Sequence, residues 1–177
     1  MIFPLYRRSA RAGTISALYG AIVAQARLPG FYRDYQVPDT VDGRFELIVL
    51  HLALVLDRLA EEPALRNFGQ GVFDQFCRDM DNNLREMGIG DLAVPKHMRR
   101  MGEAFYGRAQ AYRAALATAN AQALAETLGR NIYGGANAVQ AYRLAAYVRE
   151  AVVHLKALDR ATSAAGASLF PELDLRV

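Results

Sequence analysis

The residues best suited to chemistry lie between Phe76 and Met98, in the stretch FCRDMDNNLREMGIGDLAVPKHM. This stretch brings a thiol, an imidazole and several carboxylates together: Cys77, Asp79, Asp81, Glu86, Asp91 and His97. Groups of these types could bind a metal ion, act as general acid and base, or supply a nucleophile. Each of these uses requires a particular spacing, which the sequence can test.

A calcium-binding EF loop is the metal motif nearest to this pattern. Asp79, Asp81 and Asn83 match its first three positions. The glycine required at the sixth position is Leu84, however, and the glutamate required at the twelfth is Gly90. We therefore expect neither a metal site nor a cofactor here.

A nucleophilic Cys77 would need a base, and His97 is the only candidate nearby in the sequence. The cysteine lies between Phe76 and Met80 on an apolar helical stripe, where a thiolate is disfavoured. It also has no second ligand at the spacing of a zinc site. No phosphate-binding loop, nucleophile elbow or dinucleotide-binding glycine pattern occurs in the sequence. The sequence predicts no catalytic residue and a protein that is not an enzyme.

Ordinary helix-surface chemistry explains part of the stretch. Asp74 with Arg78, and Asp81 with Arg85, are acid-then-base pairs one helical turn apart. The remaining acidic and amide residues have no evident partner: Asp79, Glu86 and Asp91, with Asn82 and Asn83. They would suit a protein partner that offers arginines or exposed backbone, and they are equally well explained as solvated surface.

Composition indicates one globular domain in a reducing compartment. The chain has 177 residues, of which 53% are hydrophobic and 22% charged, and a single cysteine, which excludes an internal disulfide. The longest apolar run, residues 47–56, is too short to span a membrane. The net charge of +3 is modest for a nucleic-acid-binding protein.

Residues 1–13 form a predicted basic N-terminal arm. Arg7, Arg8 and Arg11 precede the first acidic residue, Asp34. An acid-poor start of this kind is typical of a transit peptide, or of an arm that touches anionic lipid or RNA. We favour the arm, because the amphipathic helix that packs on the core begins by about Thr14.

The apolar residues recur at helical spacing, and no segment alternates with the period of a strand. The predicted fold class is all-α, a single domain of about six to eight helices over residues 14–162. Residues 44–62 are apolar almost all round and predict a central helix. His51 within it lacks a second ligand one turn away, so we interpret it as a hydrogen-bonded core histidine. The tail, 163–177, could dock through Leu169, Phe170 and Leu173.

Caps and breaks indicate where the helices begin and end. Thr14, Asp42 and Asn120 are candidate N-caps, and Asn137 with Gln140 resembles a capping box. A helix at 71–87 would carry a buried stripe and end at Gly88 in a Schellman motif, with Ile89 contacting Leu84. Pro95 marks the entry of the next helix, and Gly134 with Gly135 marks a break. A last helix would bury Tyr142, Ala145, Val148, Val152 and Leu155 on its inner face. The aromatic residues Phe31, Tyr32 and Tyr35 either plug the end of the core or stack on bases.

Several blocks of the sequence resemble the ubiquinol-cytochrome c chaperone family, which assembles the cytochrome bc1 complex. They are LYGAIVAQAR at 18–27, FYRDYQVPDTVDGRFELIVLH at 31–51, and FCRDMDNNLREMGIGDLAVPKHMRRM through FYGRAQAY at 76–112. They cover roughly residues 15–115, and DTVDGRF and DMDNNLREMGIGD are quite specific. The alanine-rich C-terminal third carries little of the resemblance.

The resemblance implies a non-enzymatic assembly factor. Mitochondrial members of the family bind newly made cytochrome b, act near the ribosomal exit and work with a small partner subunit. The bacterial form has no long targeting extension, and this chain matches it, which implies the bacterial cytoplasm or the periphery of the inner membrane. The mitochondrial matrix is the alternative location.

The family's matching positions supply the candidate residues for binding cytochrome b or a partner. They are Asp39, Asp42, Gly43 and Arg44 in the first block, and Asp79, Asp81, Arg85, Glu86, Gly88, Gly90 and Asp91 in the second. Asp42 and Gly88 could serve only as cap and turn. Met87, Met98 and Met101 could form an adaptable client surface, although methionines on a stripe are more often core.

A second hypothesis from another class is a protein that binds RNA or the ribosome surface. It would use the arginine groups of the chain, Arg7, Arg8, Arg11, Arg99 and Arg100. Salt-dependent binding that is lost when these five are replaced would favour it.

Overall fold

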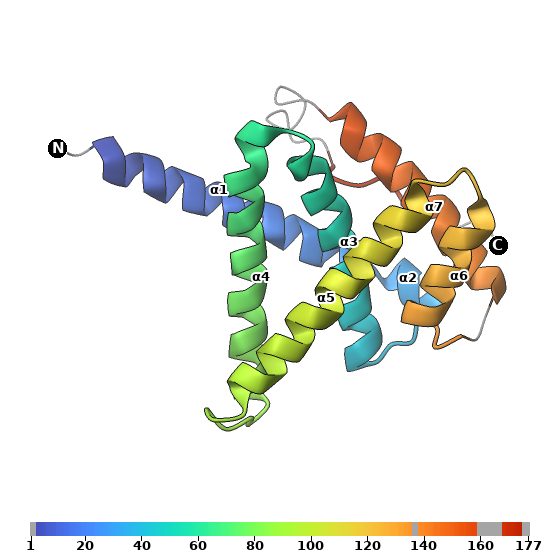
Figure 1. The fold of residues 1–177 in the computed structure, drawn as a ribbon, viewed down its shortest axis with the longest axis horizontal. Coiled ribbons are helices and arrows are strands. Elements are labelled where there is room, and N and C mark those ends of the chain that lie inside the picture. The colour runs from blue at the N-terminus through green and yellow to red at the C-terminus, as the bar shows by residue number, and fades with distance from the viewer. Residues whose placement is uncertain (1–2, 136–137, 159–167, 175–177) are drawn as a thin grey trace.

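Helix α3 (Val41–Ala60) is the element around which the others pack. In the computed structural model, which describes residues 3–135, 138–158 and 168–174, every residue of α3 from Glu46 to Val55 is buried. Helices α1 (Phe3–Ala26), α4 (Arg66–Glu86), α5 (Val94–Leu116), α6 (Ala121–Ile132) and α7 (Ala138–Ala157) each contact it. Figure 1 shows α3 beside α4 and crossing behind α5. The prediction of a central apolar helix is confirmed.

The remaining elements are short. Helix α2 (Pro29–Arg33) follows α1, and a 3-10 turn, η1 (Pro63–Leu65), leads directly into α4. No strand occurs within the described ranges, so the all-α single-domain prediction is confirmed. None of the described helices is long and apolar enough to cross a bilayer.

Three helix starts differ from the sequence prediction. Helix α1 begins at Phe3, so Thr14 lies inside it rather than at its cap. Helix α4 begins at Arg66 rather than 71, because the 3-10 turn η1 after Pro63 continues directly into it. The cap of α3 is Thr40, whose hydroxyl accepts from the Gly43 amide at 3.1 Å, and not Asp42.

Other markers were correctly interpreted. Asn120 caps α6 by accepting from the Gln122 amide at 2.9 Å. Pro95 lies in the first turn of α5, where its missing amide costs nothing. Gly134 and Gly135 break the chain with φ of +60° and +85°. The predicted cap Asn137 lies outside the described residues.

The aromatic segment after α1 closes one end of the core. Phe31 and Tyr35 are 0% and 2% exposed, so they plug the core and are not free to stack on bases. Helix α7 buries Ala145, Val148 and Leu155 as predicted, whereas Tyr142 is 47% exposed and was wrongly assigned to its inner face.

His51 lies in the same part of the core and is completely buried. Its Nδ1 is 2.7 Å from the Leu47 carbonyl and its Nε2 is 2.9 Å from the Tyr147 hydroxyl. The prediction of a hydrogen-bonded core histidine is confirmed.

Helices α4 and α5 form a V beside α3 (Figure 1). They are antiparallel, join through residues 87–93 and separate toward the start of α4 and the end of α5 (Figure 1). Helix α5 is fixed to α3 by an ion pair from Arg108 to Glu46, whose side chain is 9% exposed. One candidate surface lies at the closed end of this V, and the other lies on both sides of α5 near the open end.

Candidate interaction surfaces

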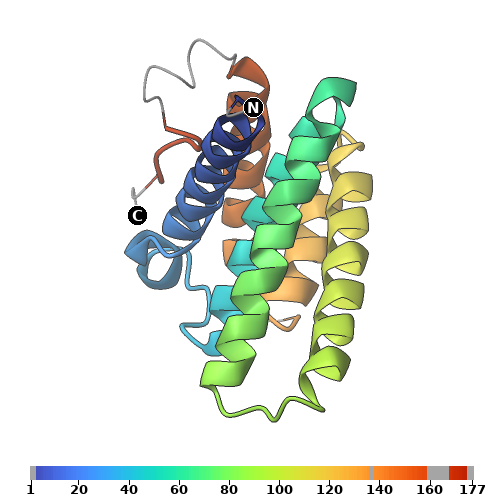
Figure 2. The ribbon, with the colours of Figure 1, turned by 90° about the vertical axis from the view of Figure 1, so that its left-hand side faces the viewer.

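The closed end of the V is built by local backbone geometry. Gly88 has a φ of +81°, its amide donates to the Arg85 carbonyl at 2.9 Å, and the Ile89 amide donates to the Leu84 carbonyl at 3.0 Å. These two bonds make the predicted Schellman motif. Residues 81–92, together with 39–44 at the start of α3, lie at the same end of the molecule (Figures 1 and 2). We call residues 39–44 and 81–92 the turn end.

Arg85 organises the acidic residues of the turn end. It donates to Asp81 at 2.7 Å and also pairs with Asp91. The predicted Asp81–Arg85 pair is therefore confirmed, and Asp91, which the sequence left without a partner, has one. Both carboxylates bind the same arginine, Arg85, and its positive charge partly offsets the negative charge that they offer to a partner.

Two further assignments in this stretch were wrong. Asp79 accepts a hydrogen bond from the Tyr19 hydroxyl at 2.8 Å and so joins α4 to α1. Arg78 donates to Gln75 at 2.9 Å instead of pairing with Asp74. Of the three acidic residues predicted to lack partners, Glu86 alone shows no side-chain bond within the described part of the chain.

The first family-like block contributes an ion pair and a tight contact. Arg44 donates to Asp39 at 2.7 Å, which lowers the pKa of that carboxyl, and Asp42 is exposed in the first turn of α3. Gly43 is buried, and a Cβ placed there would lie 2.0 Å from the Pro38 carbonyl oxygen. The glycine therefore permits the chain to enter α3.

Two apolar side chains are exposed at the turn end. Leu92 is 100% exposed and Met87 is 66% exposed. The sequence left Met87 open as part of an adaptable client surface or as core, and it points to solvent because it is the C-cap, beyond the last helical residue. Met98 and Met101 pack against the core, so they do not extend this exposed pair.

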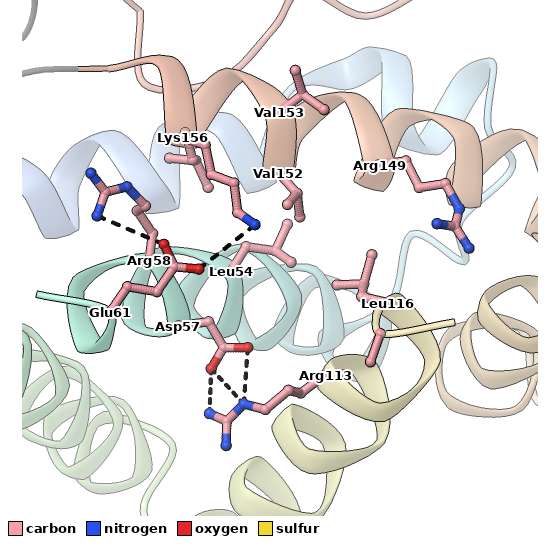
Figure 3. Close-up of a pocket in the computed structure, with 12 residues that line it drawn as sticks. Leu54, Asp57, Arg58, Glu61, Arg113, Leu116, Arg149, Val152, Val153 and Lys156 are labelled. Atoms are coloured by element: carbon pink, nitrogen blue, oxygen red, sulfur yellow. Dashed lines mark hydrogen bonds and ion pairs between the residues drawn. The ribbon is translucent and has the colours of Figure 1, made fainter. Parts of the chain in front are cut away.

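The larger of the two hollows lies beside the open end of the V, on the other side of α5 from α4, and we call it the first groove. It lies between α3, α5 and α7 and has a volume of about 560 Å³. Leu54, Leu116, Val152 and Leu155 supply apolar lining, and Val153, which is 68% exposed, stands at its edge (Figure 3).

Charged side chains surround the first groove. Arg113 of α5 pairs with Asp57 of α3, and Lys156 of α7 is 3.7 Å from Glu61, the C-cap of α3 (Figure 3). Arg149 has a different role, because it donates to the Thr118 and Asn120 carbonyls after the end of α5. The ion pairs thus tie the three helices together around an apolar floor.

A second groove lies beside the first, between α3, α4 and α5. Its volume is about 250 Å³, and its lining includes Leu56, Phe73 and Phe105, with Tyr106 at 62% exposure. Both grooves are lined by Asp57 and Arg113, so that ion pair stands between them. We call the two together the groove end. Sequence reasoning missed it, because helices far apart in the sequence build it.

Comparison with known proteins now assigns the family. The model of the ubiquinol-cytochrome C chaperone family matches residues 33–170, which is more than half of the chain. The chain belongs to this family. The match runs well into the alanine-rich C-terminal third, where the sequence had shown little resemblance.

A solved relative agrees with this assignment. The crystal structure of the Cbp3 homolog from Brucella abortus is 42% identical in sequence, with a TM-score of 0.84 and 98% of both chains covered. No curated protein matches the chain.

The arginines, the cysteine and the acidic residues that the sequence suggested for other functions do not form a common site in the described part of the chain. Arg7, Arg8 and Arg11 are positions of the first half of α1, whereas Arg99 and Arg100 are exposed near the start of α5, and Figure 1 shows these segments well apart. Cys77 packs against the core, and burial raises the pKa of its thiol. Within the described ranges, no three His, Cys, Asp or Glu side chains are grouped as metal ligands.

Proposed function

We propose that this chain is an assembly chaperone for the cytochrome bc1 complex and that it binds newly made cytochrome b before handover. The observation that carries the proposal is the family match over residues 33–170. The protein acts without catalysis, at the surface of the membrane into which cytochrome b inserts.

The groove end is the proposed client surface. A transmembrane segment outside its membrane exposes an apolar face to water, and covering that face is favourable in proportion to the area removed from water. The two grooves offer an apolar floor that continues to the exposed Tyr106 and Val153. Their ion-paired rims keep the surrounding surface polar, so the uncovered chaperone remains compatible with water.

The turn end is the proposed surface for a second protein, either a small partner subunit or the ribosome. It carries the family-like residues Asp39, Asp42 and Arg44 in one block, and Asp81, Arg85, Glu86 and Asp91 in the other. Exposed Met87 and Leu92 beside them add apolar area to a polar surface, which is the usual composition of a protein interface. Asp79 is the exception, because its bond to Tyr19 gives it a structural role.

Deleting the gene tests the function itself. We expect assembled bc1 complex and its ubiquinol-cytochrome c reductase activity to fall strongly, and a plasmid copy to restore them. Normal levels of assembled complex in the deletion strain would contradict the proposal.

Matched double variants test the client surface. Tyr106→Ser with Val153→Glu alters the groove end, and Tyr142→Ser with Val139→Glu makes the same changes at exposed positions of α7 outside the grooves. All four side chains are exposed, so both variants should fold. We expect the first to reduce capture of cytochrome b by at least about tenfold and the second to leave it unchanged.

Site-specific photocrosslinking in cells separates the two surfaces. A crosslinker at position 106 should capture cytochrome b, whereas one at position 92 should capture the partner or a ribosomal protein. Capture of cytochrome b from position 92 alone would move the client to the turn end and contradict the assignment of the grooves.

A further inference from the structure

The second groove is aromatic at one end and positively charged at the other. At the inner end, the Phe73 ring of α4 lies 5.0 Å from Phe105 and 5.6 Å from Tyr106 of α5, measured between ring centroids. Helices α4 and α5 are antiparallel, so the residues that precede Phe73 lie across from those that follow Tyr106. Arg66 of α4 and Arg113 of α5 therefore line the groove where the V is open (Figure 1).

No bond within the described chain explains the position of Arg66. This arginine is exposed, lines the groove and forms no ion pair within the described ranges. The nearest acidic residues on either side of it in sequence bind other groups: Glu62 accepts from Arg58 at 2.7 Å and Asp74 from Gln70 at 2.8 Å. Arg66 is also the first residue of α4, where the helix dipole disfavours a cation. It therefore supports neither an internal ion pair nor its own helix.

Arg113 also has a donor to spare. Its Nε and Nη2 bind the Asp57 carboxylate, whereas its Nη1 makes no hydrogen bond in the part of the chain that the structure describes. Among the described residues that line the second groove, Asp57 is the one carboxylate, against two arginines. One further carboxylate from a ligand would balance the charge of the groove.

We propose that the groove end prefers apolar client segments that carry an acidic residue, whose carboxylate Arg66 binds while apolar side chains cover Phe73 and Tyr106. This inference rests on the proposed function, because it names which segments the client surface accepts. Arg66 and Phe73 are seven residues apart on α4, which is about 10 Å along a helix. A helical segment that lies along α4 would therefore present its acidic residue two turns from its apolar one.

The charge gives selectivity, and the apolar floor gives most of the affinity. Covering apolar area is favourable for any membrane segment, because it requires no particular side chain. A carboxylate beside Arg66 is attracted, whereas a lysine at the same place meets an uncompensated like charge. The groove accordingly discriminates between segments of equal hydrophobicity.

Binding of labelled helical peptides by the full-length chain tests the inference. The three probes share one alanine- and leucine-rich sequence with a single phenylalanine. They differ only at the position seven residues away, which is glutamate, glutamine or lysine. At low salt, we expect fluorescence anisotropy to show about fivefold tighter binding of the glutamate peptide than of the glutamine peptide, with the lysine peptide weakest. Added salt should reduce these differences, because the charges are exposed.

Substitution of Arg66 shows whether this residue makes the distinction. Arg66→Gln should abolish the preference for glutamate, and Arg66→Glu should reverse it in favour of the lysine peptide. Arg100→Gln is the matched control and should keep the preference, since Arg100 is likewise exposed and lines neither groove. Both positions are exposed, so all of these variants should fold.

Equal affinities for the three peptides would overturn the inference, and so would a preference for glutamate that Arg66→Glu leaves unchanged. Absence of binding by all three peptides would overturn it as well. The proposed function is tested separately, by the deletion strain and by capture of cytochrome b from position 106. The preference for acidic segments can therefore fail while the function stands, and normal bc1 complex in the deletion strain would contradict the function whatever the peptides show.

Discussion

The turn end and the groove end differ in how the chain builds them. The turn end consists of two short stretches, and its bonds join neighbours in sequence, such as Arg85 with Asp81 and the amides that close the Schellman motif. The groove end joins residues 56 positions apart, such as Asp57 and Arg113. Local sequence therefore specifies the shape of the first surface, whereas the packing of α3, α4, α5 and α7 creates the second.

The largest effect on folding should come from the first block of the turn end. A methyl group added by Gly43→Ala would lie 2.0 Å from the Pro38 carbonyl oxygen, a backbone atom that cannot move without shifting the start of α3. We expect a loss of about 3 kcal/mol in the free energy of unfolding, measured by urea denaturation. Gly107→Ala, with nothing near its added methyl, is the control and should not destabilise. If Gly43→Ala lowered the free energy of unfolding no more than Gly107→Ala, the backbone at the start of α3 would have room for a side chain, which would contradict the prediction.

Gly43 also illustrates how far the sequence could predict this surface. The sequence showed the turn, the glycine and the start of a helix, because these depend on local propensity. It placed the cap on Asp42 and not on Thr40, since both are good capping residues and only the backbone path decides between them. It left Asp79 and Asp91 without partners, because Tyr19 lies 60 positions from Asp79 and Asp91 lies beyond a turn.

The groove end was beyond prediction for a related physical reason. Helical periodicity marks the face that is buried most deeply, such as the face of α5 that carries Phe105, which is 3% exposed. Whether the next residue, Tyr106, is solvated or lines a groove depends on the angle between α4 and α5. That angle follows from side-chain packing between the two helices, such as the contact of the Phe73 and Tyr106 rings at 5.6 Å between centroids.

A second prediction concerns how the free energy of unfolding depends on pH, and it tests a residue of the core instead of either surface. Burial lowers the pKa of His51 to about 4 from its ordinary value of 6.5. The unfolded chain therefore binds a proton at a higher pH than the folded chain, so His51 contributes stability above pH 6.5 that is lost as the pH falls toward 4. By pH 5 the loss should be about 2 kcal/mol.

The measurement compares urea denaturation of the unsubstituted chain and of His51→Gln between pH 7 and pH 5. The comparison is needed because burial raises the pKa of Glu46, which contributes with the opposite sign as the pH falls. His51→Gln should show the shallower loss, and Asp39→Asn at the turn end should match the unsubstituted chain. Equal slopes for the unsubstituted chain and His51→Gln would place the acid sensitivity elsewhere.

A smaller effect is expected at the other glycine turn. Gly88 has a φ of +81° but open space around it, so Gly88→Ala adds backbone strain without a clash. We expect a cost of about 1 kcal/mol. Gly88→Asn should cost less, since asparagine tolerates the left-handed region, and Gly90→Ala should cost almost nothing. Thermal unfolding of the three variants gives the order, and a cost for Gly90→Ala equal to that for Gly88→Ala would show that the Schellman geometry does not matter.

The smallest effects on stability are expected from removing one carboxylate charge at each surface, and they compare the two surfaces directly. Asp57→Asn removes the charge between the grooves and leaves Arg113 without a carboxylate, whereas Asp81→Asn leaves Arg85 with Asp91. Surface pairs contribute little, so Asp57→Asn should cost less than about 1 kcal/mol, and Asp81→Asn should be unchanged within error. A double-mutant cycle with Arg113→Gln measures the coupling across α3 and α5. A measurable coupling at the groove end, together with none at the turn end, means that long-range charge helps to hold the grooves in place. The reverse result would mean that the turn end depends on its ion pairs and that the grooves are held by apolar packing alone.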